Sequence, residues 1–244
     1  SSCYNMSAEV IMTKDKFIQA CEKEGIHLNQ KQIEQFERYK DLLLEWNQKM
    51  NLTAIVEEEE IWEKHFYDSI YPFFHCSIEN MCDVGSGAGF PGIPVKIVFD
   101  SIHLTIVEPL MKRCRFLEEV KKQLELKNID ICCARAEDFV KEHRESFDLV
   151  SARAVAKLSV LLELCIPLVK VNGLMVALKG KNGQLELKQA QKAISILHLN
   201  LEKEEVFHLE KEAVRMNFYF RKIKNTPVKY PRAYGQIKKK PLGE

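Results

Sequence analysis

The residues best able to do chemistry lie in one glycine-rich stretch, Met81-Cys-Asp-Val-Gly-Ser-Gly-Ala-Gly-Phe-Pro-Gly92. A short apolar run ends in Asp83, glycines follow at 85, 87 and 89, and a second apolar segment opens at Ile93. This order predicts a strand, a tight turn and the start of a helix. Glycine lets a ligand lie against main-chain N–H groups, and a helix start adds partial positive charge. The stretch therefore predicts a nucleotide-type binding site.

The spacing of the glycines narrows the class of ligand. A dinucleotide fingerprint has its third glycine at the sixth position, but the sixth position counted from Gly85 is Phe90. A bulky ring there would crowd a pyrophosphate lying along the helix start. The Gly-Lys-Ser or Gly-Lys-Thr of a phosphate loop does not follow. The pattern suits S-adenosylmethionine, a nucleoside with a small zwitterionic tail; the alternative is a glycine turn without a ligand.

Composition limits the class of protein. The chain has 244 residues, 46% of them hydrophobic, which is enough for one large domain with a real core. Lys and Arg total 36 against 35 for Asp and Glu, so the overall charge identifies no partner. The eight cysteines lack C-x-x-C spacing, which disfavours a metal and favours a reduced, cytoplasmic setting. No apolar run approaches the length of about 18 residues expected of a membrane span.

The first part of the chain, residues 1–75, is predicted to be a helical extension without strands. Thr13 can cap one helix, and Asn29 with Gln32 forms the pattern of a capping box for a second, longer one. A third helix is predicted to begin near Glu57, with acidic residues in its first turn.

From residue 80 onward, strands alternate with helices. Strands are predicted at 81–84, 103–107, 129–133, 147–151, 173–178, 205–209 and 215–222, and helices at 92–99, 112–126, 157–168 and 185–197. Such alternation predicts a mostly parallel seven-stranded sheet with helices on both faces, and the final strand pair implies one antiparallel edge strand. That ending is typical of a Rossmann-like class I methyltransferase. We expect a methyltransferase domain at 76–224 and a basic tail at 225–244.

Ligands of such a sheet bind beyond the carboxyl ends of the strands. Glu108 ends the second strand, where it could accept both ribose hydroxyls of an adenosine, or else be an ordinary surface residue. Ala136 and Glu137 follow the third strand, where an adenine would meet the backbone and a carboxylate. Asp83 could order the glycine turn, meet the ammonium group of the cofactor, or do both.

Two basic residues lie at the ends of later strands. Arg153 follows the fourth strand, at the corner that faces the transferred methyl group in sheets of this type. It could meet an anionic substrate or the methionine carboxylate, or be a surface arginine with a buried stem. Arg153 and Lys179 are expected to position substrate without moving protons. His65 and Asp68, three residues apart, are interpreted as a structural pair and not as an acid–base pair.

The C-terminal tail indicates a partner. Between Arg221 and Lys240 there are eight basic residues and no acidic one, with Tyr230 and Tyr234 among them. Prolines at 227, 231 and 241 predict an extended segment without a helix. A basic, aromatic, extended tail suits RNA, although a solvated tail is the alternative. The residues expected to contact RNA are Lys112, Arg113, Lys179, Lys181, Lys229, Arg232, Lys238 and Lys239.

Six motifs together resemble the bacterial RsmG family, also called glucose-inhibited division protein B. They are Glu45-Trp-Asn-Gln-Lys-Met-Asn-Leu-Thr53, His65-Phe-Tyr-Asp-Ser69, Asp83-Val-Gly-Ser-Gly-Ala-Gly-Phe-Pro91, Ser151-Ala-Arg-Ala154, Ala177-Leu-Lys-Gly180 and Lys229-Tyr-Pro-Arg232. The resemblance spans nearly the whole chain, roughly residues 15–243. It departs from the family in the tail, where a Tyr-Pro-Arg-Lys-x-Gly-x-Pro pattern is replaced by Tyr230-Pro-Arg-Ala-Tyr-Gly-Gln-Ile237.

The resemblance implies S-adenosylmethionine-dependent methylation of guanine N7 in 16S ribosomal RNA, by a monomer in the cytoplasm acting on this RNA or on the small ribosomal subunit. It implies cofactor contacts at Gly85, Phe90, Ala136, Glu137 and Arg153, with Glu108 at the ribose; Asp83, Gly87 and Gly89 complete the predicted cofactor site. Guanine N7 has a free lone pair and no proton, so its methylation needs no general base and relies on orientation.

Other functions remain compatible with the sequence pattern. The same sheet could methylate a small molecule or a protein, because fold alone does not specify the substrate. The chain could also be a non-catalytic RNA-binding module. A dinucleotide oxidoreductase is a more distant alternative, and Phe90 is the feature against it.

Overall fold

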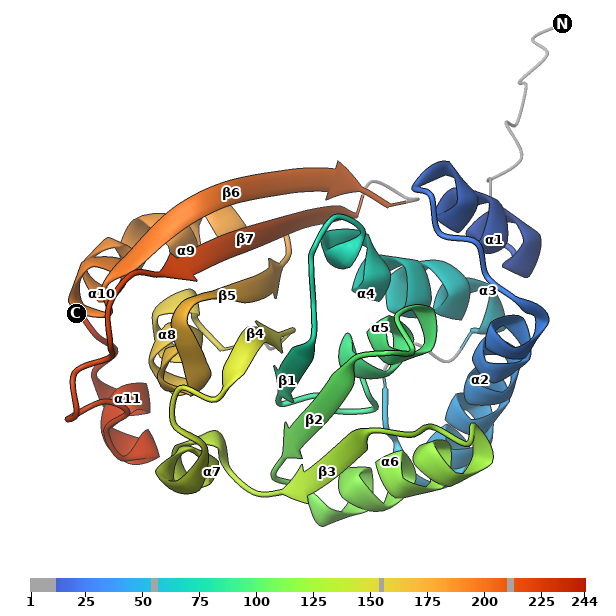
Figure 1. The fold of residues 1–244 in the computed structure, drawn as a ribbon, viewed down its shortest axis with the longest axis horizontal. Coiled ribbons are helices and arrows are strands. Elements are labelled where there is room, and N and C mark those ends of the chain that lie inside the picture. Colours follow the sequence, from blue (N-terminus) through green and yellow to red (C-terminus); the bar gives the residue numbers. More distant parts are fainter. Residues whose placement is uncertain (1–11, 54–56, 154–155, 210–212) are drawn as a thin grey trace, which may run out of the picture.

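The computed structural model describes residues 12–53, 57–153, 156–209 and 213–244, which form a seven-stranded sheet covered by helices on both faces (Figure 1). The strand order is β3-β2-β1-β4-β5-β7-β6. The strands are β1 (Asn80–Val84), β2 (His103–Glu108), β3 (Ile129–Cys133), β4 (Phe147–Ala152), β5 (Val169–Lys179), β6 (Leu199–His208) and β7 (Val214–Lys222).

Strand directions confirm the predicted sheet. Neighbouring pairs among β1 to β5 are parallel, whereas β7 is antiparallel to both of its neighbours, β5 and β6. The antiparallel strand therefore lies one place in from the outermost strand, β6. This is the mostly parallel sheet with an antiparallel ending that distinguishes class I methyltransferases from plain dinucleotide folds.

The N-terminal helices begin where their capping residues predict. Thr13 accepts a hydrogen bond from the Lys16 N–H at the start of α1 (Lys14–Lys23). At the start of α2 (Gln30–Met50), Asn29 and Gln32 exchange two hydrogen bonds of 2.9 Å, which is the predicted capping box. A continuous helical segment follows, formed by α3 (Glu58–Glu60), η1 (Ile61–Tyr67), α4 (Asp68–Ile70) and η2 (Tyr71–Phe73).

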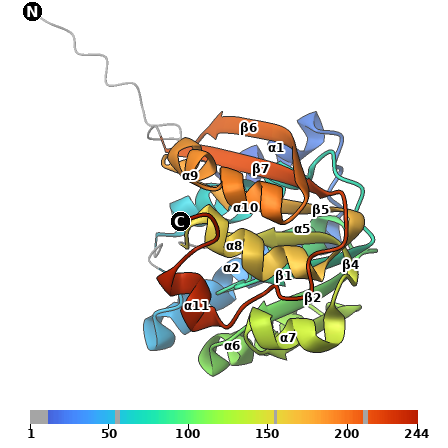
Figure 2. The ribbon, with the colours of Figure 1, turned by 90° about the vertical axis from the view of Figure 1, so that its left-hand side faces the viewer.

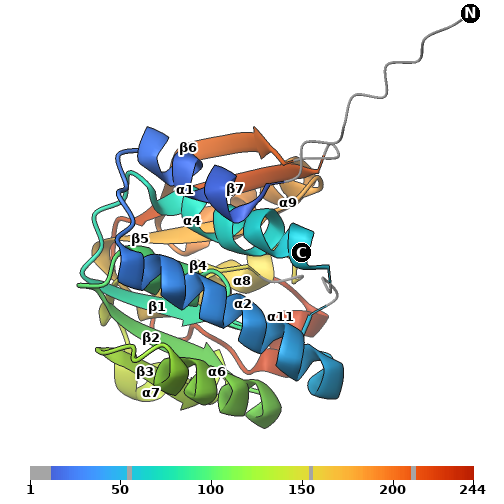
Figure 3. The same cartoon turned by 90° about the vertical axis from the view of Figure 1, so that its right-hand side faces the viewer.

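The helices lie in two layers, one on each face of the sheet. The N-terminal helices and α6 (Met111–Gln123) cover one face, as Figure 3 shows, and α5 (Gly92–Val98) lies with them beside α4 in Figure 1. The other face is covered by α7 (Ala136–His143), α8 (Leu158–Cys165), α9 (Gly183–Gln189) and α10 (Gln191–Ile196), as Figure 2 shows, with the short helix η3 (Ile166–Leu168) after α8. Because successive strand residues point to opposite faces, Met81 joins the first hydrophobic core and Cys82 the second.

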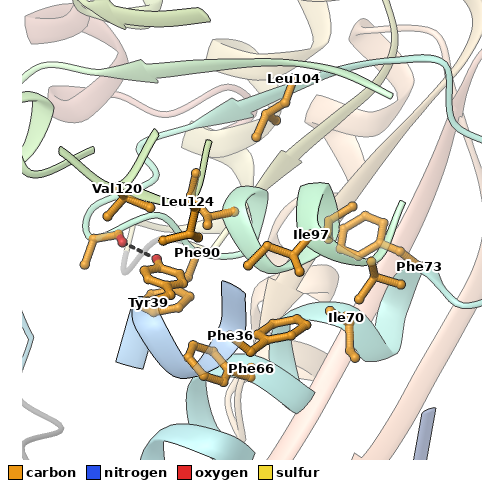
Figure 4. Close-up of a cluster of buried hydrophobic side chains, with 14 of the residues drawn as sticks. Phe36, Tyr39, Phe66, Ile70, Phe73, Phe90, Ile97, Leu104, Val120 and Leu124 are labelled. Atoms are coloured by element: carbon orange, nitrogen blue, oxygen red, sulfur yellow. Dashed lines mark hydrogen bonds between the residues drawn. The ribbon is translucent and has the colours of Figure 1, made fainter. Parts of the chain in front are cut away.

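An aromatic cluster fills the first core where the N-terminal helices meet the glycine turn (Figure 4). Phe90 is stacked on Tyr39 at a centroid distance of 5.6 Å, and Tyr39 is stacked on Phe66 at 5.5 Å. The Tyr39 hydroxyl donates a hydrogen bond to the carbonyl of Ala88, shown by the dashed line. The helical layer is thus bonded directly to the turn.

The C-terminal tail is folded, and the prediction of a tail without helix is wrong. Residues Tyr234–Lys239 form the helix α11, which packs beside α8. Pro231 and Pro241 lie outside this helix, where proline does not interrupt its hydrogen bonds. Three tail side chains are buried in the second core: Tyr230, Ile237 and Leu242.

No helix among the residues that the structure describes combines the length and apolar character needed to cross a membrane.

Candidate active site

The glycine turn connects β1 to α5, and its three glycines have different roles. All three have positive φ angles: 67° at Gly85, 60° at Gly87 and 110° at Gly89. A Cβ at Gly89 would stand 2.7 Å from Cγ1 of Ile93 and closer still to the Tyr39 hydroxyl. Among the described residues, no atom lies within 4 Å of a Cβ placed at Gly85 or Gly87. Gly89 therefore allows close packing, whereas the other two glycines border open space that a ligand can occupy.

Asp83 is fully buried beneath the turn and holds it in shape. Its Oδ2 accepts hydrogen bonds from the Ser86 hydroxyl at 2.6 Å and the Gly92 N–H at 2.9 Å, and its Oδ1 accepts one from Ser151 at 2.9 Å. Burial raises the pKa of Asp83 to about 6 against these hydrogen bonds. The geometry shows the turn-ordering role, and the predicted contact with a cofactor ammonium group stays a prediction.

Glu108 ends β2 beside the turn and is buried. Its Oε1 accepts a hydrogen bond from the Gly87 N–H at 3.0 Å, and its Oε2 accepts one from the Leu110 N–H at 2.7 Å. Arg113 places Nη1 3.6 Å from Oε1, and its buried Nε has no hydrogen-bond partner among the residues that the structure describes. An ionised carboxylate offers about four lone-pair sites. Glu108 therefore keeps unused acceptor capacity beside the turn, which is compatible with the predicted ribose contact.

The loop after β3 forms the neighbouring part of this edge. Glu108 and Cys133 are paired across the ends of β2 and β3, and α7 begins at Ala136. Ala136 is buried and Glu137 is half-buried, with Oε1 of Glu137 3.8 Å from Nη1 of Arg135. The backbone and carboxylate expected to meet an adenine thus lie next to the expected ribose position.

Arg153, after β4, is held by the N-terminal helical layer. Its guanidinium donates hydrogen bonds to the Lys64 carbonyl at 3.3 Å and to Nδ1 of His65 at 3.1 Å. It lies 4.9 Å from the centroid of the Phe90 ring and 3.9 Å from Oδ2 of Asp68. The last residue of the Ser151-Ala-Arg-Ala154 motif lies outside the described residues. Arg153 therefore has a fixed position at the predicted methyl-transfer corner.

His65 is packed and hydrogen-bonded at this corner, and it is linked to Asp68 through a shared partner, Arg153. Its ring is stacked on Phe90 at 4.1 Å with the planes 1° apart, and its Nε2 lies 3.0 Å from the Thr53 hydroxyl. Burial, reinforced by the charges of Arg153 and Arg215, lowers the pKa of His65 to about 2. Because Nδ1 accepts from Arg153, Nε2 carries the proton and donates to Thr53. A neutral imidazole with both nitrogens bonded does not serve as a base.

Asp68 completes this network and brings in a residue that the sequence interpretation missed. Its Oδ2 accepts a hydrogen bond of 2.8 Å from Nε of Arg215, at the start of β7. Arg215 is 147 residues away in the sequence, and it lies outside every quoted motif, so no local signal pointed to this pair.

The ring of Phe90 is not placed where it could crowd a pyrophosphate, although the sequence suggested that it would. Its ring is 3% exposed and lies in the aromatic cluster, between Tyr39, His65 and Arg153. It therefore does not project over the start of α5, where it was expected to crowd a pyrophosphate. The antiparallel strand β7 is the structural feature that argues against a dinucleotide fold, and any cofactor contact of Phe90 would involve its backbone.

The cations expected to contact RNA separate into two groups. Lys112, Lys181, Lys229, Lys238 and Lys239 are exposed. Three others have internal partners: Arg113 lies at Glu108, Lys179 pairs with Glu186 at 2.9 Å, and Arg232 makes a bidentate pair with buried Glu163, its shortest contact 2.7 Å. Lys179 is 5% exposed. Only Lys179 is buried among these three; the side chains of Arg113 and Arg232 keep 35% and 24% of their surface exposed.

Comparison with known proteins identifies the family. The family model described as rRNA small subunit methyltransferase G matches residues 32–215. The chain is 49% identical over 237 residues to "Ribosomal RNA small subunit methyltransferase G" of Lysinibacillus sphaericus, covering 95% of this chain and 100% of that protein. It is also 49% identical over 237 residues to the protein of the same name from Bacillus subtilis, covering 95% and 99%.

Solved structures support the fold. M. jannaschii TYW2 in complex with AdoMet superimposes with a TM-score of 0.53 at 18% identity, covering 64% of this chain and 77% of that one. TrmN from Thermus thermophilus gives a TM-score of 0.51 at 15% identity, covering 64% and 48%. The S-adenosylmethionine-dependent methyltransferase predicted from the sequence is confirmed by fold and family together. The chain belongs to the rRNA small subunit methyltransferase G family.

Proposed function

We propose that this protein transfers the methyl group of S-adenosylmethionine to N7 of a guanine in 16S ribosomal RNA. The observation that supports this most directly is the 49% identity, along 95% of the chain, to a ribosomal RNA small subunit methyltransferase G. We further propose that it acts in the cytoplasm as a monomer, on 16S RNA or on the small ribosomal subunit.

The residues at the carboxyl ends of the strands suit the cofactor. The backbone of Gly85 and Gly87 borders open space, Glu108 offers acceptors for ribose hydroxyls, and Ala136 with Glu137 lies where an adenine would be read. Arg153 offers a fixed cation for a carboxylate. When bound, the cofactor supplies an electrophilic methyl group on a sulfonium.

The protein's own contribution is positioning. Guanine N7 carries no proton, so the reaction needs no base, and the residue nearest to that role, His65, has both nitrogens bonded. Asp68, His65 and Phe90 hold the guanidinium of Arg153 from three sides. A preorganised cation orients an anionic group without reorganising during the reaction. Arg153 therefore orients either the methionine carboxylate or the RNA beside the methyl group.

The RNA is proposed to meet five exposed cations, namely Lys112, Lys181, Lys229, Lys238 and Lys239. Lys179 is proposed to act indirectly. Its ammonium group donates to the carbonyl of Ala156 and pairs with Glu186, so it ties Ala156 to α9.

The proposal is tested with purified protein, labelled S-adenosylmethionine and 16S RNA from cells that lack this protein. Digestion of the product RNA and chromatography should show label in N7-methylguanosine. Label in another nucleoside would contradict the N7 assignment. Transfer that persists without RNA would indicate a small-molecule or protein methyltransferase, and absence of cofactor binding in calorimetry would indicate a non-catalytic RNA-binding module.

A further inference from the structure

The C-terminal segment, residues 225–244, runs across the second helical layer, from the side of the sheet where β4 begins to the side where β4 ends. It starts beside Glu145, just before β4, where Asn225 donates hydrogen bonds of 3.0 Å to both carboxylate oxygens. It ends just after β4, where Glu244 lies 3.2 Å from the ammonium group of Lys157. Figure 2 shows the end of this path, with α11 beside α7 and α8. The segment therefore finishes at the carboxyl ends of the strands, where the cofactor is proposed to bind; we call this side of the sheet the cofactor edge.

Buried contacts hold this segment in place. Arg144 donates hydrogen bonds to three of its carbonyls, those of Thr226, Pro227 and Tyr230. Arg232 pairs with Glu163, whose side chain is fully buried. The segment has a defined path because it is fixed by the pairing of Arg232 with buried Glu163 and by the apolar side chains of Tyr230, Ile237 and Leu242.

This path places an aromatic ring beside the expected adenine position. The guanidinium carbon of Arg135 lies 5.2 Å from the centroid of the Tyr234 ring. Arg135 immediately precedes Ala136 and Glu137, on the loop whose β3 end is paired with Glu108. The side chain of Arg135 is 56% exposed and Tyr234 is half-buried, so the stacked pair is accessible from solvent.

Arg135 lies 3.8 Å from the carboxylate of Glu137, but the segment that carries Tyr234 is basic, which suits an anionic polymer. Four lysines of the segment are exposed: Lys229, Lys238, Lys239 and Lys240. The sequence from Arg221 to Lys240 contains no acidic residue. Proteins bind single-stranded RNA by combining a basic surface with aromatic rings or arginine planes on which bases stack.

We propose that Arg135 and Tyr234 form a stacking platform for a base of 16S RNA next to the methylated guanine. The proposal rests on the proposed function and adds to it a second position at which RNA is held. Stacking is tolerant of base identity, so the platform fixes the register of the strand and leaves the selection of the target base to the pocket.

The test compares Tyr234→Leu with Tyr234→Phe. Binding of 16S RNA is measured by filter retention in the presence of S-adenosylhomocysteine, and cofactor binding by calorimetry. The leucine variant should bind RNA about 5- to 100-fold more weakly, the phenylalanine variant should bind nearly as the wild type does, and cofactor affinity should be unchanged in both. Tyr71→Leu is the matched control. Tyr71 belongs to the other helical layer, where its ring is stacked on Phe207 of β6, and its loss should leave RNA affinity unchanged.

Salt dependence separates stacking from charge. Tyr234→Leu should leave the slope of log affinity against log salt unchanged, whereas combined Lys238→Gln and Lys239→Gln should reduce it by about 1.4, at roughly 0.7 for each phosphate contact with a single strand. Unchanged RNA affinity in Tyr234→Leu would overturn the platform, and weakened cofactor binding would reassign the pair to the cofactor pocket. Because these readouts do not depend on which atom is methylated, failure of the N7 assignment would be seen separately in the product analysis.

Discussion

At the scale of single residues, two buried carboxylates organise the cofactor edge through backbone hydrogen bonds. Asp83 holds the start of α5 through the Gly92 N–H, and Glu108 holds the middle of the turn through the Gly87 N–H. A Cβ at Gly92 would stand 2.8 Å from Oδ2 of Asp83, so glycine is required there. The two residues differ in their partners, because Asp83 accepts hydrogen bonds from two hydroxyls and one N–H, whereas Glu108 accepts from two N–H groups and lies 3.6 Å from Nη1 of Arg113.

Glu108→Gln should therefore weaken cofactor binding selectively. The new amide group would direct its own N–H toward the Gly87 or Leu110 N–H and would lose the charge that favours a hydroxyl donor. We expect S-adenosylhomocysteine to bind about 1–3 kcal/mol more weakly in calorimetry, with RNA affinity nearly unchanged. Glu118→Gln, on the exposed side of α6, is the control. Equal cofactor affinity in the Glu108 variant and the wild type would contradict the assigned ribose role.

Asp83 should make stability depend on pH in an unusual direction. Its folded-state pKa of about 6 lies above its ordinary value of 3.8, so the folded state holds the proton more tightly than the unfolded state does. The free energy of unfolding should fall as pH rises from about 4 to about 6, by up to about 3 kcal/mol. Urea unfolding of Asp83→Asn should lack this decrease, and Asp138→Asn, at an exposed carboxylate, should retain it. Parallel pH profiles of wild type and Asp83→Asn would show that Asp83 does not titrate in this window.

At the scale of helices and strands, local patterns predicted what local forces determine. The capping box at Asn29 and the strand at 129–133 were predicted correctly, because side-chain spacing and short-range hydrogen bonds define them. The helix predicted at 185–197 is divided into α9 and α10 at Ala190. The helix α11 was missed because its prolines were taken as breakers, although they flank it.

Whether a basic side chain points to solvent or to an internal carboxylate was the least predictable property of the site. Arg232 was expected at the RNA surface, yet its partner Glu163 lies 69 residues earlier in the sequence. Lys179 likewise turns inward to Glu186. Sequence shows that a residue is basic, but whether it faces solvent or a buried carboxylate depends on tertiary packing. The glycine turn was predictable because its ligand-facing groups are backbone atoms within one short segment.

The anchor of the C-terminal segment can be tested by removing one member of its charge pair. Arg232→Ala leaves Glu163 buried without its cation, which should lower the free energy of unfolding by about 3–5 kcal/mol. Arg221→Ala breaks a pair with Glu202 in which both side chains are about one-third exposed, and should cost at most about 1 kcal/mol. Urea denaturation of the two variants measures the contrast. Equal losses would show that Arg232 contributes no more than a surface cation does.

At the scale of the whole molecule, the N-terminal extension is part of the principal core. The first core joins Phe17 and Phe36 of the extension to Leu104 of β2 and Phe116 of α6. The boundary predicted at residue 75 therefore separates segments in the sequence that share one hydrophobic cluster in space. The extension also supplies three partners of Arg153, namely Lys64, His65 and Asp68, so the predicted methyl-transfer corner depends on the helical layer.

We therefore expect the extension and the sheet to unfold in a single transition. Both tryptophans, Trp46 and Trp62, lie in the helical layer, so their fluorescence reports on that layer, whereas far-ultraviolet circular dichroism reports on all helices and strands. In urea the two signals should share one midpoint. S-adenosylhomocysteine at about 100 times its Kd should raise the free energy of unfolding by about 2.7 kcal/mol in both signals, since it binds only the folded protein. A fluorescence transition at lower urea that the ligand leaves in place would show that the helical layer unfolds independently of the cofactor edge.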